Sequence, residues 1–138
     1  MLEATLILIK PDAVDHEHWL PIIHMYEKNG ITFHGTRIMS PMPEHVACSL
    51  YEEHRGKPFF KGLIAHMTRG VTMAFYAHGD NAITKTRELN GNTSPAKAEP
   101  YTIRAMFGTE GPANAVHASE NAEAAQRELA LFFGKKHR

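Results

Sequence analysis

The stretch Thr5-Leu6-Ile7-Leu8-Ile9-Lys10-Pro11-Asp12 opens the pattern of elements from which the fold is predicted. Its first five residues favour the β-conformation. They are followed by a proline, which has no backbone N–H donor, between two polar residues typical of a loop. We therefore expect a strand over residues 5–9 that ends in a loop at residues 10–12.

A helix and a second strand are expected next. Apolar residues recur at helical spacing over residues 19–26, and Asn29-Gly30 is a stop signal. Residues 31–39 return to a strand-like composition. Within them Gly35 marks a weak point or a bulge.

The rest of the chain alternates helical and strand-like patterns around one long irregular segment. Residues 90–112 are dominated by Gly, Pro, Thr, Ser and Asn, and a loop of this length in a compact domain is usually functional. The other expected elements are a helical hairpin over 46–51 and 59–67, a strand over 71–77, a helix over 81–89, a short apolar strand at 115–116 and a final helix from near Ser119 to Phe132.

This order of elements does not suit an uninterrupted parallel sheet. It fits an α+β fold of the ferredoxin-like, split βαβ kind, in which a four-stranded antiparallel sheet carries helices on one face. The helical hairpin and the long loop are additions to that plan. With 138 residues and 43% hydrophobic content, the chain is expected to form one domain over residues 1–138. This architecture hosts enzymes, ligand sensors and RNA-binding modules, so it does not determine function.

The composition argues against several kinds of partner. Fifteen Lys and Arg balance fifteen Asp and Glu, so the net field gives no general attraction to nucleic acid or anionic membrane. The single Cys48 excludes an intrachain disulfide, and the first residues lack the basic and apolar regions of a signal peptide. The longest aliphatic run, residues 6–9, is far shorter than the roughly 20 residues that cross a bilayer. We therefore expect a cytoplasmic protein with no membrane segment and no specific nucleic-acid partner.

Ten histidines are present, and two of them lie close together in His16-Glu17-His18. Zinc sites usually need three or four converging ligands, and no second His or Cys pair has a recognisable ligand spacing. We therefore expect His16 and His18 to be solvated side chains at the start of a helix.

The stretch Asn114-Ala115-Val116-His117-Ala118-Ser119-Glu120, followed at helical distance by Glu128, carries the chemistry. A neutral imidazole is a competent phosphoryl acceptor, and a nearby carboxylate fixes its tautomer and stabilises the charge it gains. His117 and Glu128 are the candidates for these two roles. Taken alone, the same residues could be a strand end and a solvated helix charge.

This stretch resembles the active-site motif of nucleoside diphosphate kinases, commonly Asn-x-x-His-Gly-Ser-Asp, and the resemblance runs from Thr5 to Phe133. Ile9-Lys10-Pro11-Asp12 resembles the end of the family's first strand, and Tyr51 with Lys57-Pro58-Phe59-Phe60-Lys61-Gly62-Leu63 resembles its nucleotide-clamping hairpin. Thr93-Ser94-Pro95-Ala96 and Pro100-Tyr101-Thr102-Ile103-Arg104 fall where the family has Thr-Asn-Pro-Ala and Pro-Gly-Thr-Ile-Arg. Several motifs in the right order are far more specific than any one of them.

The resemblance implies that the terminal phosphoryl group of a nucleoside triphosphate, typically ATP, passes to a nucleoside diphosphate by a ping-pong mechanism. The group would pass through a phosphohistidine on His117, with Glu128 orienting the ring and Ser119 bridging the two. Lys10 would approach the transferred phosphate. This chemistry needs positive charge and hydrogen-bond donors around the migrating group more than it needs covalent help.

The nucleotide-binding residues implied by the resemblance supply charge, hydrogen bonds and stacking. Lys10, Arg87 and Arg104 carry the charge, and the planar fork of arginine suits phosphate oxygens. The remaining roles fall to the hydroxyl groups of Tyr51 and Thr93, to His54 at the phosphate nearest the sugar, to Asn114 at a ribose hydroxyl, to Leu63 in the hairpin, and to Phe59 stacked on the base. Stacking tolerates every base, so broad nucleotide specificity is expected. Singly, each side chain could equally be a core residue or a surface charge.

The expected cofactor is Mg²⁺, carried by the nucleotide phosphates. The sequence has no Gly-x-x-x-x-Gly-Lys-Ser/Thr segment, so a P-loop reaction is not supported. Mg²⁺ usually keeps several of its waters, and Glu120 is the one residue expected to reach it, through a water. The resemblance also implies a homo-oligomer, a tetramer or hexamer built from dimers, with residues 90–112 taking part in assembly.

Four positions depart from the family pattern. Ala118 and Tyr101 replace glycines, and Glu120 replaces an aspartate. Gly111 lies where the family often has an apolar residue covering the base, so stacking would be one-sided. None of these changes removes the nucleophile or a charged group, so activity is expected.

The sequence disfavours two alternative functions. A weakly active or non-catalytic nucleotide-binding relative is disfavoured because the charged residues are present together with His117. A ferredoxin-like RNA-binding module is disfavoured because no segment resembles its aromatic motif and the net charge is zero.

Overall fold

The computed structural model describes residues 1–134 and contains a four-stranded sheet. The strands are β1 (Leu2–Ile9), β2 (Thr32–Met39), β3 (Thr72–Asp80) and β4 (Val116–Ala118). Their order is β2-β3-β1-β4, and every neighbouring pair is antiparallel. The predicted α+β, ferredoxin-like plan with a four-stranded antiparallel sheet is therefore confirmed.

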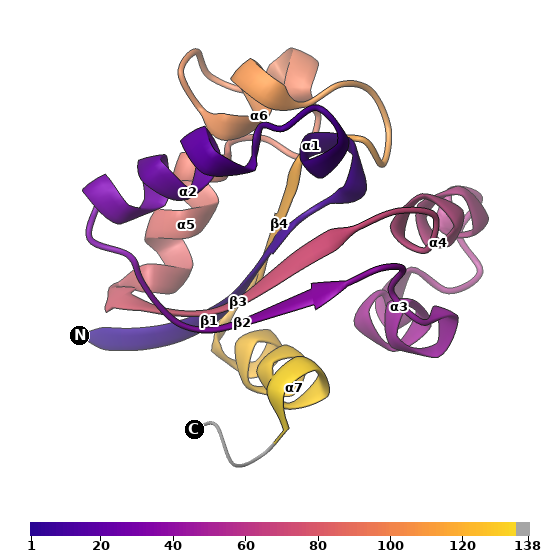
Figure 1. Cartoon of the computed structure of the whole chain (residues 1–138), viewed down its shortest axis with the longest axis horizontal. Helices are drawn as coiled ribbons and strands as arrows, with labels where there is room; N and C mark the ends of the chain where they lie inside the picture. The colour runs from indigo at the N-terminus through magenta and orange to yellow at the C-terminus, as the bar shows by residue number, and fades with distance from the viewer. Residues whose placement is uncertain (135–138) are drawn as a thin grey trace.

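Helices connect these strands and follow the last of them (Figure 1). The α-helices are α1 (Pro11–Asp15), α2 (Trp19–Lys28), α3 (Glu44–Leu50), α4 (Phe60–Met67), α5 (Ala82–Asn90), α6 (Ile103–Phe107) and α7 (Ala122–Phe133), and the 3₁₀ helices are η1 (Glu52–His54) and η2 (Pro95–Lys97). The pair α3 and α4 is the predicted helical hairpin. No helix within residues 1–134 is long and apolar enough to cross a membrane.

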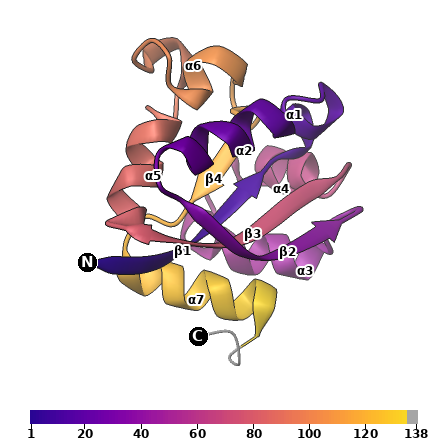
Figure 2. The same cartoon turned by 60° about the vertical axis from the view of Figure 1, so that its left-hand side comes forward.

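Helices cover both faces of the sheet, so the expectation of helices on one face was wrong. Figures 1 and 2 show α2 and α5 on one side of the sheet and α7 on the other. Leu6 and Leu8 pack into a core with α3, α4 and α7, whereas Ile7 and Ile9 pack into a second core with α2 and α5. The continuous aliphatic run of β1 reflects this burial on both faces, since a strand with one wet face would alternate apolar and polar residues.

Two short helices replace expected loops. Residues 11–15 form α1, in which Pro11 occupies the first turn, where its missing N–H costs no helical hydrogen bond. Within residues 90–112, α6 begins after Thr102, whose hydroxyl accepts a hydrogen bond from the backbone N–H of Ala105 at 3.3 Å. Both helices have five residues, which is too short for a clear apolar periodicity.

Smaller expectations about the strands and the last helix had mixed outcomes. The predicted irregularity at Gly35 is confirmed by a register shift between Phe33 and Gly35 in the pairing of β2 with β3. The last helix was expected to start near Ser119 but begins at Ala122. Asn121 caps that helix by accepting a hydrogen bond from the backbone N–H of Ala124 at 2.8 Å.

We propose that the two cores unfold as one domain, and a truncation on α7 tests this. Phe132 is completely buried against the sheet, so Phe132→Ala should lower the free energy of unfolding by about 3–5 kcal/mol. Trp19 lies on α2, across the sheet, and its fluorescence in urea should follow the same transition as circular dichroism. Gln126→Ala, at an exposed position of α7, is the control and should change stability by about 0.5 kcal/mol at most. Separate transitions for the two probes would contradict the proposal.

Candidate active site

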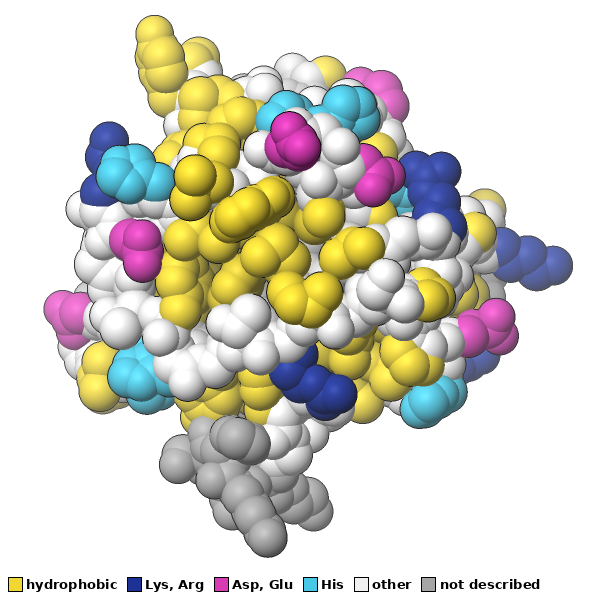
Figure 3. Space-filling view, in the orientation of Figure 1, with side chains coloured by type: hydrophobic (Ala, Val, Ile, Leu, Met, Phe, Trp, Pro, Cys, Tyr) yellow, Lys and Arg dark blue, Asp and Glu magenta, His cyan; other side chains and the backbone are white. Residues whose placement is uncertain are grey.

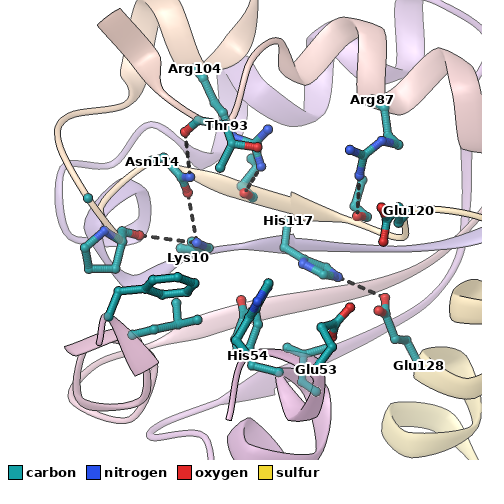
Figure 4. A pocket seen from close by; sticks show the side chains of 18 residues that line it. Lys10, Glu53, His54, Arg87, Thr93, Arg104, Asn114, His117, Glu120 and Glu128 are labelled. Atoms are coloured by element: carbon teal, nitrogen blue, oxygen red, sulfur yellow. Dashed lines mark hydrogen bonds and ion pairs between the residues drawn. The ribbon is translucent and has the colours of Figure 1, made fainter. Parts of the chain in front are cut away.

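A cavity of about 490 Å³ opens where the ends of β1 and β4 meet the α3–α4 hairpin (Figure 4). The predicted site residues come from widely separated parts of the chain, and those that line the cavity are Lys10, Tyr51, His54, Phe59, Leu63, Arg87, Thr93, Arg104, Asn114, His117, Glu120 and Glu128. Ser119 is the exception, because it is completely buried beside Glu128. The fold thus brings the predicted set to one place.

His117 lies on β4, in register with Leu8 of β1, and its ring is held by Glu128. The distance from His117 Nε2 to Glu128 Oε1 is 2.9 Å. Ser119 Oγ donates to the same carboxylate oxygen at 2.9 Å and accepts from the backbone N–H of Leu6 at 3.2 Å. Since a carboxylate only accepts, Nε2 carries the proton and the lone pair of the neutral ring lies on Nδ1.

Glu128 stays ionised although it is buried. Burial by itself raises the pKa of this carboxyl. The hydrogen bonds from His117 and Ser119, together with the positive charges of a protonated His117 and of Arg127, outweigh burial, so the net pKa of Glu128 is lowered. Its negative charge is therefore available to stabilise a positive charge on the imidazole.

Lys10 is buried directly after β1 and faces neutral oxygen atoms. Its Nζ donates to Oδ1 of Asn114 at 2.8 Å and to the backbone carbonyl of Pro112 at 3.3 Å. Burial, reinforced by the nearby Arg104 guanidinium, lowers the pKa of Lys10 to about 7, and Asp12 opposes this shift. The ammonium group is therefore poorly compensated until an anion approaches it.

The two arginines also bond to backbone carbonyls. Arg104 donates from Nη1 to Gly91 at 2.9 Å and from Nη2 to Val116 at 2.8 Å, and burial lowers its pKa. Arg87 Nη1 lies 3.5 Å from the carbonyl oxygen of Ala118. Within residues 1–134, the hydrogen bonds that the two guanidinium groups donate all go to neutral backbone carbonyls. Their charge can therefore act on an anion in the cavity.

Two buried polar groups beside the cavity lack partners within residues 1–134. They are the hydroxyl of Tyr51 and Nε of Arg104. Burial raises the pKa of Tyr51, so its hydroxyl remains a proton donor. Unpaired buried donors are rare in native proteins and indicate that a ligand with acceptor oxygens completes the site.

The α3–α4 side of the cavity offers an aromatic platform. Phe59 stands directly before α4 with 52% of its surface exposed, and its ring centroid lies 5.2 Å from that of His54. Lys57 Nζ lies 5.8 Å from the Phe59 centroid and 3.1 Å from His54 Nδ1. Leu63 lines the cavity one helical turn further on. A flat ligand group can therefore stack here.

Several lining residues were not expected from the sequence. Glu53 lies in η1 beside His54, and nothing in the sequence distinguishes it from the neighbouring Glu52. The backbone carbonyl of Pro112 accepts a hydrogen bond from Lys10 Nζ. A backbone contact of this kind does not depend on the side chain, so the residue type does not predict it. Leu50 is the last residue of α3, and its side chain forms an apolar part of the cavity wall.

His16 and His18 pack against each other, with ring centroids 5.7 Å apart, and His18 also packs against Phe107 at 4.8 Å. His16 Nδ1 lies 2.8 Å from the carbonyl oxygen of Asp12. Over residues 1–134, no group of three or more His, Cys, Asp or Glu side chains is arranged to hold a metal ion.

Comparison with known proteins identifies the family. A family model described as Nucleoside diphosphate kinase matches residues 3–137. The chain belongs to the nucleoside diphosphate kinase family. A nucleoside diphosphate kinase from Clostridium perfringens is 43% identical over 134 residues, which are 97% of this chain and 93% of that protein.

Solved nucleoside diphosphate kinases have the same fold. The enzyme from Aquifex aeolicus superposes with a TM-score of 0.91 at 34% identity and covers 96% of each chain. The enzyme from Halobacterium salinarum, solved in complex with CDP, superposes with a TM-score of 0.91 at 36% identity over 96% of this chain and 88% of that chain. The family resemblance read from the motifs is thereby confirmed.

The departures from the usual nucleoside diphosphate kinase motifs differ in backbone conformation and in exposure. Tyr101 has a φ of 70°, a region that favours glycine, and 84% of its surface is exposed. Ala118 is buried on β4, and it is not one of the residues within 1–134 that have a positive φ. A Cβ atom at Gly111 would meet no other atom within 4 Å, so the cavity wall is open at this residue.

The lowered pKa of Glu128 makes stability depend on pH. A carboxyl group whose pKa is lower in the folded protein contributes stability above its ordinary pKa of 4.5, and this contribution is lost as the pH falls through the folded-state value. We expect the free energy of unfolding of the wild type to fall more steeply below pH 4.5 than that of Glu128→Gln, which does not titrate. Urea unfolding at several acidic pH values measures both, and parallel curves would contradict the expectation.

Proposed function

We propose that this nucleoside diphosphate kinase transfers the terminal phosphoryl group of a nucleoside triphosphate to a nucleoside diphosphate through a phosphohistidine on His117. The observation that carries the proposal is the imidazole of His117, oriented by Glu128 at 2.9 Å, in a cavity with three poorly compensated cations. A nucleophile with an orienting base partner is the arrangement required for covalent catalysis.

In the first half-reaction the lone pair on His117 Nδ1 attacks the terminal phosphorus. The bond from that phosphorus to the bridging oxygen breaks, and the nucleoside diphosphate leaves with the electron pair. Glu128 stabilises the positive charge on the phosphorylated ring through the proton on Nε2. In the second half-reaction a terminal oxygen of another diphosphate attacks the same phosphorus, and the electron pair returns to Nδ1.

Lys10, Arg87 and Arg104 stabilise the charge on the migrating group and its neighbours. Preorganised positive groups act strongly on such charge in a site that excludes water. The Tyr51 hydroxyl donates to a phosphate oxygen, as does Thr93. His54 reaches the phosphate nearest the sugar.

The nucleoside is held at the aromatic end of the cavity. Phe59 stacks on the base, Leu63 packs beside it, and Asn114 bonds to a ribose hydroxyl. The halophilic relative from Halobacterium salinarum was solved with CDP, which agrees with a nucleotide as ligand. With Gly111 opposite, stacking is one-sided and the preference among bases is weak.

Mg²⁺ is the proposed cofactor, carried in on the phosphates. It would neutralise phosphate charge and hold the phosphate oxygens in place. The carboxylates of Glu53 and Glu120 line the cavity, and Glu120 would contact the ion through a water.

We also propose a cytoplasmic homo-oligomer, a tetramer or hexamer built from dimers. Figure 3 shows hydrophobic side chains gathered over the face where α2 and β2 lie in Figure 1. Leu20 on α2 and Ile38 on β2 are exposed by 61% and 57%, and within residues 1–134 β2 pairs on one edge only. Such a face and edge are suited to contact with a second copy. Residues 90–112 are proposed to contribute further contacts between subunits.

The central experiment is phosphorylation with γ-labelled ATP. We expect wild-type protein to carry acid-labile, base-stable label that is lost on addition of a nucleoside diphosphate. His117→Ala should carry no such label and should transfer no phosphate, because the variant lacks the nucleophile. Circular dichroism of the variant controls for folding, and near wild-type transfer by a folded His117→Ala would overturn the mechanism.

Base stacking is tested by Phe59→Ala. Loss of the aromatic platform should weaken nucleotide binding by about 1–3 kcal/mol, for purine and pyrimidine nucleotides alike. Titration calorimetry with ADP and CDP measures both affinities. Tyr101→Ala, which removes an exposed aromatic side chain outside the cavity lining, is the matched control and should bind as the wild type does. A loss confined to one base would show that the base is read by hydrogen bonds instead.

A further inference from the structure

A strained turn lies directly before the proposed nucleophile. Ala115 is completely buried and has a φ of 76°, which non-glycine residues rarely adopt. The backbone N–H of Val116 donates to the carbonyl of Asn114 at 3.0 Å, across Ala115, which is the bond of a γ-turn with positive φ. The turn sets the spacing between Asn114, which holds Lys10, and His117.

Both polar backbone atoms of Ala115 are held by the segment after β1. The Ala115 N–H donates to Oδ2 of Asp12 at 3.0 Å, and the Ala115 carbonyl accepts from the backbone N–H of Lys10 at 2.8 Å. A strained backbone conformation persists only where its surroundings hold it in place. Asp12 is the side chain that accepts from the Ala115 N–H, while Arg104 Nη2 donates to the carbonyl of Val116 at 2.8 Å.

The other carboxylate oxygen of Asp12 binds the helical hairpin. Oδ1 of Asp12 lies 2.9 Å from Nε2 of His66, and both side chains are largely buried. His66 is on α4, the helix that Phe59 caps and that carries Leu63. One carboxylate therefore joins the base-binding hairpin to the turn that precedes His117.

We propose that Asp12 is a positioning residue for phosphoryl transfer, and that its pair with His66 couples the hairpin to the Ala115 turn. Asp12 is not among the residues that line the cavity, so it acts through the backbone of Ala115 and not on the substrate. The proposal rests on the proposed function, because its kinetic readout is the phosphorylation of His117.

Loss of the Asp12 carboxylate would lower the rate of phosphoryl transfer by changing the geometry of the turn. Without the Asp12 carboxylate, the buried Ala115 N–H has no acceptor, and the turn relaxes toward a negative φ. Such a change moves Asn114 relative to His117, and with them Lys10 relative to the reacting phosphate. Misplacement by about 1 Å can lower a rate by about 100-fold.

The kinetic experiment is stopped-flow phosphorylation of the full chain against ATP concentration. Asp12→Ala should lower the limiting rate by about 10- to 100-fold, while the half-saturating ATP concentration changes by less than about threefold. Asp12→Asn should recover most of the rate, because its amide oxygen accepts from Ala115 and its amide nitrogen donates to a neutral His66. Asp15→Asn, an exposed acid on the same helix, is the matched control and should behave as wild type.

The coupling to the hairpin is tested with His66→Phe, which keeps an aromatic ring at this position and removes its bond to Asp12. It should lower the limiting rate less than Asp12→Ala does, and adding it to Asp12→Ala should cause no further loss. If Asp12→Ala does not fold, Asp12→Asn and His66→Phe decide the matter. A wild-type limiting rate in His66→Phe would overturn the coupling.

Three results would overturn the role of Asp12: an unchanged limiting rate in Asp12→Ala, a change in half-saturation alone, or an Asp12→Asn variant as slow as Asp12→Ala. Hydrogen exchange of the Ala115 amide gives a readout independent of activity, and exchange should be faster in Asp12→Ala and His66→Phe than in the wild type. If the wild type is not phosphorylated by ATP, the proposed function fails. The exchange rates then still decide whether Asp12 and His66 hold the turn.

Discussion

The antiparallel pairing of β4 with β1 is the interaction on which the rest of the site depends. Three residue pairs form it, including Leu8 with His117 and Ile9 with Val116. Because Lys10 follows β1 and Asn114 precedes β4, this register sets the lysine and the asparagine side by side. The bond from the Leu6 N–H to Ser119 extends the same contact and holds the serine against Glu128. One short ladder therefore aligns the proposed nucleophile His117, its partner Glu128 and the buried Lys10.

The electrostatics of the site oppose the stability of the empty protein. Lys10 and Arg104 are buried, and the lowered pKa of each records the cost of holding charge away from water. Their hydrogen bonds go to neutral oxygen atoms and do not neutralise the charge. A polyphosphate brings the missing negative charge, so part of its binding energy comes from relieving a cost already present in the folded chain. Both faces of the sheet are buried, and the free energy of this burial offsets the cost of the buried charges.

Much of the fold could be predicted from the sequence, because long elements leave periodic patterns. The strands and the longer helices were found in this way, and the bulge at Gly35 followed from one residue type. The two-sided burial of β1 was missed although its aliphatic run, Leu6 to Ile9, is typical of a strand without a wet face. The five-residue helices α1 and α6 leave no such pattern, because their boundaries are set by Pro11, Thr102 and tertiary contacts.

The site was predictable where chemistry resides in side chains and unpredictable where it resides in backbone geometry. His117, Glu128 and the cations were identified through motifs, and they meet in one cavity. The turn at Ala115 has no such signal, since positive φ is usually marked by glycine or asparagine and here the residue is alanine. What holds it is a carboxylate 103 positions earlier in the chain. A conformation imposed by so distant a contact is a property of the folded protein, which is why reading the chain locally does not reveal it.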